Sequence, residues 1–292
     1  PLFIDELRPH LSSADPDARA FIAKGAKESY FIKVKRSGLS KTNTILSFLA
    51  KNGINEIILP LDNRFGSGYT SFLEYELAVF PYISGQDGFH KTLTDNQWTR
   101  FGTLLKKIHQ LDPTTIQPIV RNENLTAQNL LQSKIYNEDA KDRGVDFDTE
   151  SIDRLIEKVS ALEPTVKNKL LKPCFCHGDI HGGNLLISDS GNLFIVDWDD
   201  PIIGPKELDL MFIGGGVENV WNKAEETQVF YSGYGTSAFD ADLLAYIRSR
   251  RILDDFVFYY PELYQNKGSD LMYKHFLNMF KPNGVIEIAL NT

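Results

Sequence analysis

The first 80 residues carry short apolar runs typical of strands, with one helical segment among them. ARAFIAKG and ESYFIKVKR flank a glycine-containing turn, which predicts a β-hairpin. INEIILPL and FLEYELAVFPYI are rich in Ile, Leu, Phe and Tyr and also favour strands. In TNTILSFLAKNG the apolar residues Ile45, Phe48 and Leu49 have helical spacing, so a helix is expected here that stops at Gly53.

Beyond this region the periodicity becomes helical. PYISGQDGF contains Pro81, Gly85 and Gly88, which interrupt every regular pattern and predict a crossover. LTDNQWTRFGTLLKKIHQLD then opens with Thr94 and Gln97 in capping-box spacing. Its apolar residues form one helical stripe, made of Trp98, Phe101, Leu104, Leu105 and Ile108. Further helices are expected over SIDRLIEKVSALEPTVKNKL, where Pro164 favours a break, over ADLLAYIRSRRILDDFVFYY and over DLMYKHFLNMF.

These patterns predict an α+β fold with two lobes. A small strand-rich lobe is expected over residues 1–80, a crossover over 81–88, and a larger, mainly helical lobe over 89–292. A chain of 292 residues is long enough for a sizeable core, and 42% hydrophobic with 24% charged residues is ordinary for a globular protein.

Charge mainly excludes classes of partner. A net charge of -8 and a pI near 5.3 argue against a nucleic-acid or membrane-surface binder, which would show a basic face. The acidic balance is compatible with a cationic small-molecule ligand and equally with simple solubility. Because no apolar run has transmembrane length and no signal-peptide pattern is found, a cytoplasmic location is expected. Composition leaves monomer and dimer open.

The chain has two cysteines, Cys174 and Cys176, one residue apart on an expected strand. Their side chains point the same way, but such neighbours rarely meet disulfide geometry. The absence of a CxxC pair argues against a zinc site. Two buried core thiols are therefore expected, which fits a reducing compartment.

The densest group of chemically active residues is HGDIHGGNLLISDSGNLFIVDWDD, residues 177–200. CFCHGD predicts a strand that ends in a loop bearing Asp179, and NLLISDSGNLFIVDWD predicts a hairpin that turns at Asp189–Gly191. Such a hairpin brings Asn184 close to Asp197. Carboxylate and amide oxygens are ligands that Mg²⁺ prefers, so these two residues are candidate metal ligands. Asp179 is the candidate that accepts a hydroxyl proton and orients the attacking oxygen.

The pattern H-G-D-x-H-x-G-N followed by I-V-D-W-D resembles the aminoglycoside phosphotransferase and choline-kinase family. Protein kinases have the same order: an Asp, an Asn five positions later, and a metal-binding Asp after a hairpin. The resemblance implies a protein-kinase-like fold and Mg²⁺-dependent transfer of the γ-phosphoryl of ATP or GTP to a hydroxyl of a small, aminated acceptor. It implies spectinomycin or a related aminocyclitol as acceptor, and hence antibiotic resistance. It also implies that Asp209 in ELDLMF braces the catalytic loop, although an acid at a helix N-terminus explains Asp209 nearly as well.

On the nucleotide side, Lys33 and Lys35 lie on one face of the strand SYFIKVKR. The resemblance favours Lys33 as the residue that holds the phosphates, and a solvated strand face is the alternative. The loop SSADPDA contains no GxGxxG, so phosphate contacts there would come from backbone amides and from Ser12 or Ser13. VFPYISG resembles the hinge of the family, in which backbone groups of Phe80 and Tyr82 would bind adenine. Ordinary packing is an equal alternative for both residues.

One kinase feature is missing from its usual place. Protein kinases pair the phosphate-binding lysine with a glutamate on the following helix, but LSKTNTILSFLA has no acidic residue. Either the acid comes from elsewhere in the chain, or residues are missing near Gly38.

Acceptor-binding residues are harder to assign. Asp199, Asp200 and Glu218 are candidates for attracting a cationic acceptor, with Trp221 or Trp198 as an apolar wall. Solvated acids and core tryptophans are the alternative for each. His177 and His181 have no matching nucleophile, so a hydrolytic triad is not supported. The glycines GGG at 214–216 follow LMFI rather than opening a helix and predict a tight bend or close packing.

Three functions therefore compete. The first is an aminocyclitol or aminoglycoside kinase, and the second is a metabolic kinase that acts on choline, an amino alcohol or a sugar. The third is a catalytically weak nucleotide-binding protein, which the missing acid favours and the intact Asp179, Asn184 and Asp197 oppose. A protein kinase is disfavoured because no APE-type segment follows Asp197.

Overall fold

The computed structural model describes residues 4–10, 18–235, 239–264 and 268–292. Its contacts divide the chain into two compact units. The first unit comprises Pro1–Lys91, Leu111–Arg121 and Gly183–Pro201, and the second comprises Thr92–Gln110, Asn122–Gly182 and Ile202–Thr292. The lobe boundaries expected at residues 80 and 89 stay a prediction. The division into compact units differs from them, because it groups two later segments with the N-terminal residues.

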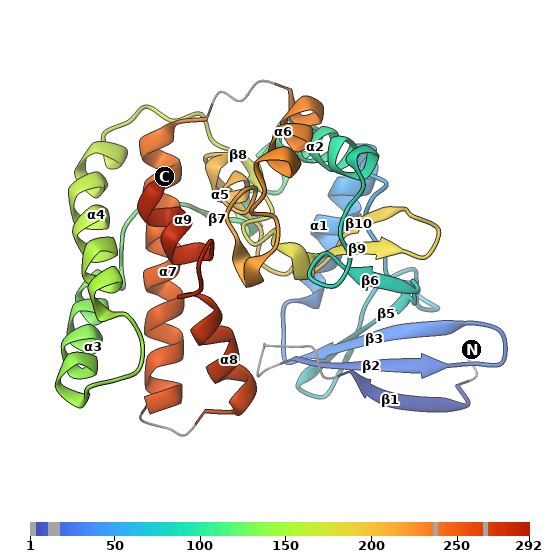
Figure 1. The fold of residues 1–292 in the computed structure, drawn as a ribbon. Helices are drawn as coiled ribbons and strands as arrows, with labels where there is room; N and C mark the ends of the chain where they lie inside the picture. Colours follow the sequence, from blue (N-terminus) through green and yellow to red (C-terminus); the bar gives the residue numbers. More distant parts are fainter. Residues whose placement is uncertain (1–3, 11–17, 236–238, 265–267) are drawn as a thin grey trace. The chain divides into compact units, whose positions relative to one another are not determined.

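The first unit contains a five-stranded antiparallel sheet (Figure 1). Its order is β1 (Glu6–His10), β2 (Ala18–Lys24), β3 (Ser29–Lys35), β5 (Tyr75–Pro81) and β4 (Thr70–Phe72). The expected hairpin is confirmed as β2–β3, whose turn is closed by the Gly25 amide on the Glu28 carbonyl at 2.9 Å. FLEYELAVFPYI is divided between two strands that turn at Leu73, a residue with φ of 53°.

The helix α1 (Leu39–Lys51) packs against β5 through a buried apolar stripe that includes Ile45 and Leu49. Gly38 precedes the helix and offers no capping side chain. Glu76 of β5 supplies the cap instead, because its Oε2 accepts the amides of Leu39 at 2.7 Å and Ser40 at 3.3 Å. A carboxylate at this position also complements the positive end of the helix dipole. Tertiary structure therefore caps a helix whose own sequence lacks a cap.

The strand expected over INEIILPL is wrong, because residues 54–61 form no regular strand. Ile54 and Ile57 are buried, so the apolar pattern reflects burial rather than a ladder of hydrogen bonds. Pro60 has no amide to donate, and this segment meets the sheet only at its end, where the Leu61 amide donates to the Val79 carbonyl at 2.7 Å.

The hairpin expected after residue 184 is confirmed as β9 (Leu185–Ser188) and β10 (Leu193–Ile195). Its turn contains Gly191 at φ of 85°, whose amide donates to the Ser188 carbonyl. A third strand, β6 (Gly85–Asp87), pairs with β9 and was not expected, because glycines usually interrupt strands. Gly85 is required here: a Cβ at this position would lie 2.3 Å from the Ile187 carbonyl oxygen. The Ile195 amide donates to the Glu56 carbonyl, which joins the hairpin to the segment that follows α1 within the first unit.

In the second unit, α2 (Asp95–His109) packs along α6 (Ala224–Tyr234). The predicted capping box of Thr94 and Gln97 is confirmed, and the five residues of the predicted stripe are all buried. The two helices approach closely because glycines face the partner backbone. A Cβ on Gly102 would lie 2.2 Å from the Phe230 carbonyl oxygen, and one on Gly233 would lie 1.9 Å from that of Thr99.

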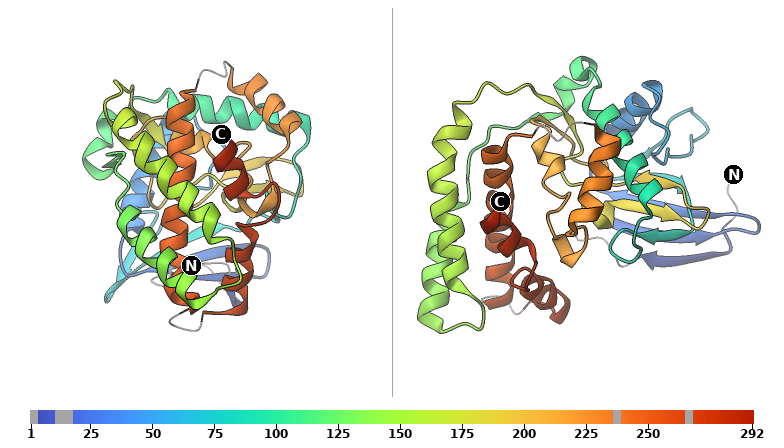
Figure 2. Two further views of the ribbon diagram at one scale, coloured as in Figure 1. Left: turned by 60° about the vertical axis from the view of Figure 1, so that its left-hand side comes forward. Right: turned by 45° about the horizontal axis from the view of Figure 1, so that its top comes forward.

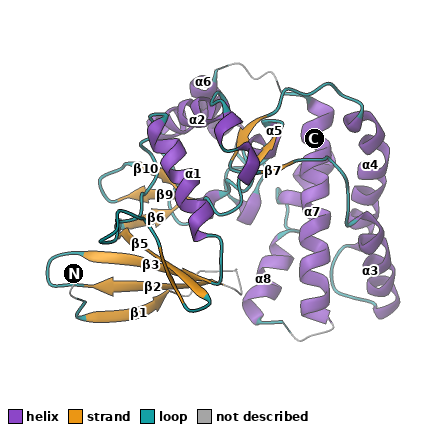
Figure 3. Ribbon diagram, turned by 180° about the vertical axis from the view of Figure 1, so that it is seen from behind, coloured by secondary structure: helices purple, strands orange, loops and turns teal. Residues whose placement is uncertain are grey.

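A second helical layer contains α4 (Thr149–Lys167) and α7 (Ala241–Tyr264), which lie side by side (Figure 2). α3 (Leu130–Arg143) packs against both (Figure 3), while α8 (Asp270–Asn278) and α9 (Val285–Asn291) contact α7 (Figure 1). The break expected at Pro164 is wrong, since α4 continues to Lys167. Pro164 lies in the last turn, and apolar residues on either side, Val159 and Val166, are fully buried and hold the helix in place.

A small sheet and a bend carry the chemically active loops. The sheet has the order β7 (Arg121–Asn122), β11 (Ile202–Gly204) and β8 (Cys174–Cys176), and the short helix α5 (Glu207–Leu210) follows β11. Four 3₁₀ turns are found in the described residues: Pro113–Thr115, Gln117–Ile119, Gly182–Asn184 and Val217–Asn219. The predicted bend at 214–216 is confirmed, since Gly214 and Gly216 have positive φ angles. None of the helices in the described ranges is both long and apolar enough to cross a membrane.

Candidate functional site

Lys33 in the first unit bonds to two aspartates that follow the β9–β10 hairpin. Its Nζ lies 2.7 Å from Asp197 Oδ1 and 2.8 Å from Asp199 Oδ2. Burial acts to lower the pKa of Lys33, but the two carboxylates outweigh it and raise the pKa above its ordinary value. Lys33 is therefore a fixed positive charge.

This arrangement answers the question of the missing acid. Helix α1 supplies none, but the chain provides acids from elsewhere, as one of the two alternatives expected. Asp199 also accepts from Lys35 Nζ at 2.8 Å and from the hydroxyl of Thr42 on α1 at 3.1 Å. Burial acts to raise the pKa of Asp199, and the two lysines more than offset it, so its pKa is lowered. The charge of Asp199 is compensated within the first unit, which gives no support to its expected acceptor role.

Asp200 lies beside two other cations of the first unit. Its Oδ1 is 3.2 Å from Lys41 Nζ and its Oδ2 is 2.9 Å from Arg121 Nε. Because Asp200 and Arg121 are more than half exposed, these pairs contribute little to stability. The acceptor-binding role of Asp200 stays a prediction.

Asn184 and Asp197 are held at the two ends of the β9–β10 hairpin. The Val196 amide donates to the Asn184 backbone carbonyl at 3.0 Å. This hydrogen bond holds together the open end of the hairpin, where Asn184 precedes β9 and Asp197 follows β10. Asp197 has a φ of 63°, a left-handed conformation that is costly for a residue with a Cβ. Asn184 is buried, whereas half of the Asp197 side chain is exposed. An amide and a half-exposed carboxylate fit the oxygen ligands that Mg²⁺ takes in phosphoryl-transfer sites.

Asp179, in the second unit, lies in a cluster of opposite charges. Its Oδ1 accepts from Arg251 Nη1 of α7 at 2.9 Å, and its Oδ2 lies 3.6 Å from His181 Nε2. Arg251 also bonds Asp255 one turn along α7, through Nε at 3.0 Å. Burial acts to raise the pKa of Asp179, but His181 and Arg251 outweigh it and hold the pKa well below its usual range. Asp179 is therefore a carboxylate at every pH in which the protein is expected to work.

Removal of the Arg251 charge should alter the pH dependence of any activity that needs the Asp179 carboxylate. In Arg251→Met the pKa of Asp179 is expected to rise, since the guanidinium that stabilises the carboxylate is lost. The acidic limb on which activity falls as Asp179 is protonated, which lies below the working range in the wild type, should then move to higher pH, because a group with a depressed pKa loses its charged form only as pH falls through that pKa. Arg251→Lys keeps the charge and should leave the limb in place. Equal profiles for Arg251→Met and the wild type, both measured as kcat against pH, would contradict this prediction.

Asp209 is fully buried below the loop that leads to Asp179. Its Oδ2 accepts from the His177 amide at 2.9 Å, and its Oδ1 accepts from the Gly178 amide at 2.7 Å. Oδ2 also lies 2.9 Å from Nε2 of His109, whose Nδ1 is 2.8 Å from the Tyr234 hydroxyl. Burial acts to lower the pKa of His109, and the Asp209 carboxylate outweighs it and raises the pKa. The loop is thus tied by two backbone hydrogen bonds to a carboxylate that is itself held by an imidazole.

The expected nucleotide contacts are only partly described. Ser12 and Ser13 lie outside the described residues. Phe80 pairs with Phe31 across β3 and β5, and their rings lie 6.4 Å apart. The Tyr82 amide donates to the Ser29 carbonyl at 3.1 Å and so belongs to the sheet. A contact between adenine and backbone groups of Phe80 or Tyr82 stays a prediction.

The other expected acceptor residues have partners within the second unit. Glu218, at φ of 53°, accepts from Asn278 Nδ2 at 2.8 Å and lies 2.6 Å from His275 Nδ1. Trp221 is buried against Trp98 and Phe101, at ring distances of 5.3 and 5.5 Å. These contacts favour the packing alternative for both residues, whose acceptor-binding role remains a prediction. In the first unit, Trp198 is buried and donates from Nε1 to the Ile195 carbonyl at 3.0 Å, which also agrees with a core role.

Comparison with known proteins decides the family. A model of a phosphotransferase enzyme family matches residues 6–245, which is most of the chain. The chain belongs to this family. The N-terminal antiparallel sheet and the mainly helical remainder form a mixed α+β fold that matches kinase-like solved structures. The predicted family, fold class and enzyme class, a phosphotransferase that acts on a hydroxyl group, are confirmed.

Solved structures of phosphotransferases resemble the chain over nearly its whole length. Spectinomycin phosphotransferase APH(9)-Ia, crystallised with ADP and spectinomycin, is 34% identical with a TM-score of 0.89, over 99% of this chain and 93% of that one. An AMP-bound structure of the same phosphotransferase is 32% identical with a TM-score of 0.86, over 100% and 94%. Choline kinase LicA from Streptococcus pneumoniae, 14% identical over 99% and 94% with a TM-score of 0.60, shares the fold alone. No curated protein matches the chain.

Sequence reasoning about this phosphotransferase missed several residues of the two clusters. Arg251 and Asp255 are four residues apart on a helix, a spacing that signals an ion pair but not its third partner, Asp179. Thr42 and His109 carry no local signal, because their partners Asp199 and Asp209 are far away in the sequence.

Proposed function

We propose that this phosphotransferase transfers the γ-phosphoryl group of ATP or GTP to a hydroxyl of an aminocyclitol- or aminoglycoside-type acceptor, with spectinomycin as the first candidate. The observation that carries the proposal is the match over 99% of the chain, at 34% identity and a TM-score of 0.89, to a spectinomycin phosphotransferase. That protein was crystallised with ADP and spectinomycin, which supports a nucleotide co-substrate and a small aminated acceptor. The same function implies cytoplasmic action and antibiotic resistance.

We assign Mg²⁺ to Asn184 and Asp197. When bound, the ion neutralises the charge that develops on the phosphates. Asp197 Oδ1 accepts a hydrogen bond from Lys33 Nζ, so the lysine and the metal ion would use the same carboxylate. Lys33 is a fixed cation that can exchange this carboxylate for phosphate oxygens when nucleotide binds. Its second partner, Asp199, keeps the ammonium directed toward this end of the hairpin.

We assign to Asp179 the task of orienting the acceptor hydroxyl and taking its proton as the new P–O bond forms. A strongly depressed pKa makes Asp179 a weak base, so its main contribution is orientation and electrostatic stabilisation of the polarised hydroxyl. Proton transfer is needed late in the reaction, because the transition state for phosphoryl transfer is loose and the hydroxyl becomes acidic only as the bond forms.

The two strand lysines should differ in their effect on the nucleotide. Lys33→Met is expected to lower kcat/KM for ATP by about 10–100-fold, the value of one charge-assisted hydrogen bond. Lys35→Met, on the same face of β3, should cost much less, because Lys33 is the lysine that bonds the candidate metal ligand Asp197, at 2.7 Å, whereas Lys35 bonds Asp199. Steady-state kinetics with varied ATP measure both. A larger loss in Lys35→Met than in Lys33→Met would reverse the assignment.

The test of the proposed function is Mg²⁺-dependent transfer from ATP and from GTP to a panel of spectinomycin, other aminocyclitols, aminoglycosides, choline and amino sugars. Transfer to spectinomycin supports the proposal in full. Transfer only to choline or a sugar keeps the reaction and overturns the acceptor, which makes the chain a metabolic kinase. Nucleotide binding without transfer to any acceptor overturns the enzymatic proposal and favours a nucleotide-binding protein. Expression in susceptible bacteria then tests resistance separately.

A further inference from the structure

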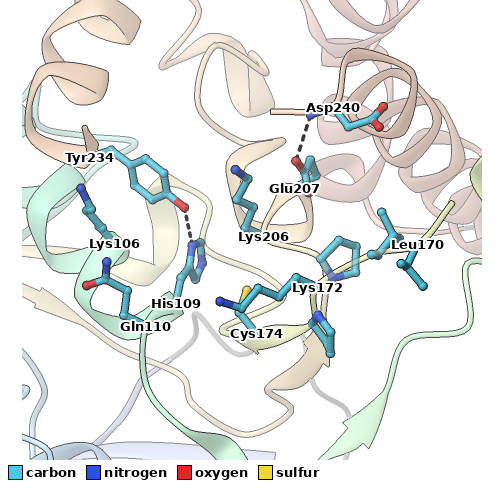
Figure 4. A pocket seen from close by; sticks show the side chains of 13 residues that line it. Lys106, His109, Gln110, Leu170, Lys172, Cys174, Lys206, Glu207, Tyr234 and Asp240 are labelled. Carbon is cyan, nitrogen blue, oxygen red and sulfur yellow. Dashed lines mark hydrogen bonds between the residues drawn. The ribbon is translucent and has the colours of Figure 1, made fainter. Parts of the chain in front are cut away.

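A pocket of about 460 Å³ opens in the second unit beside the start of β8 and the end of α2. Its lining includes His109, Cys174 and Tyr234, with the charged residues Lys172, Lys206 and Glu207 (Figure 4). The picture shows the His109 imidazole between the Tyr234 hydroxyl and the Cys174 sulfur. None of these side chains is assigned above to the nucleotide, the metal or the acceptor, and His109 acts on the Asp179 loop only through Asp209, so the pocket calls for its own explanation.

His109, Cys174 and Cys176 come together at this pocket. One ligand atom from each, a ring nitrogen and two sulfurs, lies within 4.8 Å of the others. The two Sγ atoms are 3.5 Å apart, and both cysteines are free thiols. Two thiolates on one tetrahedral Zn²⁺, each at about 2.3 Å, lie roughly 3.8 Å apart. The sulfur pair therefore already has nearly the separation that a single tetrahedral cation requires.

Rigid elements hold this arrangement. β8 pairs with β11 in the register Cys174 with Gly204 and Cys176 with Ile202, so both cysteine side chains project from the same face of one strand. His109 is the last residue of α2, which contacts β8. Cys174 is partly exposed to the pocket, whereas Cys176 is buried and makes weak contacts with the carbonyls of Gly204 and Pro205. A cation thus has an entry path and an inner ligand shielded from water.

The imidazole of His109 is also prepared for ligation. Its Nε2 bonds the buried carboxylate of Asp209 at 2.9 Å, as the second nitrogen of a metal-bound histidine usually does. Its Nδ1 faces the Tyr234 hydroxyl at 2.8 Å, a neutral partner that a cation can displace. Two thiolates and an imidazole select thiophilic cations over Mg²⁺ or Ca²⁺. The two thiolates neutralise a divalent ion beside the lysines that line the pocket.

We propose that Cys174, Cys176 and Nδ1 of His109 form a binding site for one thiophilic divalent cation of the Zn²⁺ class, with water in the fourth position. The sequence, which has no CxxC pair, argues against such a site. The pattern misses it because the third ligand, His109, lies on a helix far from the cysteines in the chain. The site is separate from the Mg²⁺ ligands Asn184 and Asp197, which offer only oxygen atoms.

Calorimetry with Zn²⁺ and absorption spectroscopy with Co²⁺ test the site on the tag-free chain, without nucleotide or acceptor. We expect one ion per chain and a thiolate-to-Co²⁺ charge-transfer band with the spectrum of a tetrahedral site. Cys174→Ser, at the partly exposed ligand, should weaken Zn²⁺ binding by more than the about 10–100-fold typical of losing an outer partner. His90→Gln, a change at an exposed imidazole, should leave binding unchanged.

Tyr234→Phe provides a test that misfolding cannot imitate. Removal of the hydroxyl frees Nδ1 from its present partner, so Zn²⁺ binding should tighten by about fivefold, the worth of one ordinary hydrogen bond. Weaker binding in Tyr234→Phe would overturn the assignment of Nδ1. A Co²⁺ spectrum without a thiolate band, or equal Zn²⁺ affinity in Cys174→Ser and the wild type, would overturn the site itself. None of these three results bears on the proposed kinase function, because no transfer is measured.

Discussion

Asp179→Asn is expected to lower kcat for phosphoryl transfer by about 10²–10⁴-fold, the usual contribution of a positioned general base. Asparagine has nearly the same shape as aspartate, but its amide has no negative charge to polarise the acceptor hydroxyl and cannot take the proton. It also leaves the Arg251 guanidinium, now 2.9 Å from Asp179 Oδ1, with Asp255 as its remaining carboxylate partner. The loss should therefore appear in kcat, while the affinity for nucleotide, which is assigned to residues of the first unit, should change little.

The measurement is steady-state transfer to the best acceptor of the panel, with nucleotide affinity determined separately by calorimetry. Asp142→Asn, at an exposed aspartate on α3, is the matched control and should retain full activity. Full activity in Asp179→Asn would remove Asp179 from the mechanism. Loss of nucleotide binding together with activity would show that the substitution disturbs more than the acceptor step.

Local patterns predicted the elements that depend on neighbouring residues. The capping box of Thr94 and Gln97, the turn at Gly191 and the stop of α1 near Gly53 each arise from interactions within a few residues, and all three are present. The order of Asp179, Asn184 and Asp197 was equally visible, because the motif is nearly continuous. The apolar run at 54–61 misled because burial alone, without a strand partner, produces the same composition as a strand.

Contacts between distant residues could not be predicted in the same way. α1 has no acid, and its sequence gave no sign that Glu76 caps it or that Asp197 and Asp199 bond Lys33. The negative charge of Asp199 and Asp200 predicts an attraction for a cationic acceptor, yet the cations beside them come from β3, α1 and Arg121. The sequence shows that a residue is charged but does not show which opposite charge pairs with it, because that depends on its neighbours in the folded structure.

Asp209→Asn is expected to have the largest effect on stability, with a loss of about 3–5 kcal/mol in the free energy of unfolding, typical of a broken buried ion pair. Both oxygens of Asp209 are acceptors: Oδ1 for the Gly178 amide, and Oδ2 for the His177 amide and His109 Nε2. Asparagine replaces one oxygen by an NH₂ donor, so at least one N–H then faces another donor in the buried interior. The charge of His109 also loses its partner. Because the two amides immediately precede Asp179, kcat should fall as well.

The pH dependence identifies the His109–Asp209 pair as the cause. The pKa of folded His109 is raised above the ordinary 6.5, so the pair contributes its full stability below that value and loses it as pH rises through the raised pKa. Urea unfolding at pH 6.5 and at several higher values should show a wild-type advantage over Asp209→Asn that shrinks with rising pH. In the background of His109→Gln the advantage should be smaller and independent of pH over this range, which a double-mutant cycle measures. If His109 is intact and the difference in unfolding free energy between the wild type and Asp209→Asn still does not change with pH, the prediction is contradicted. The amides of His177 and Gly178, rather than the imidazolium, would then account for the whole contribution of Asp209.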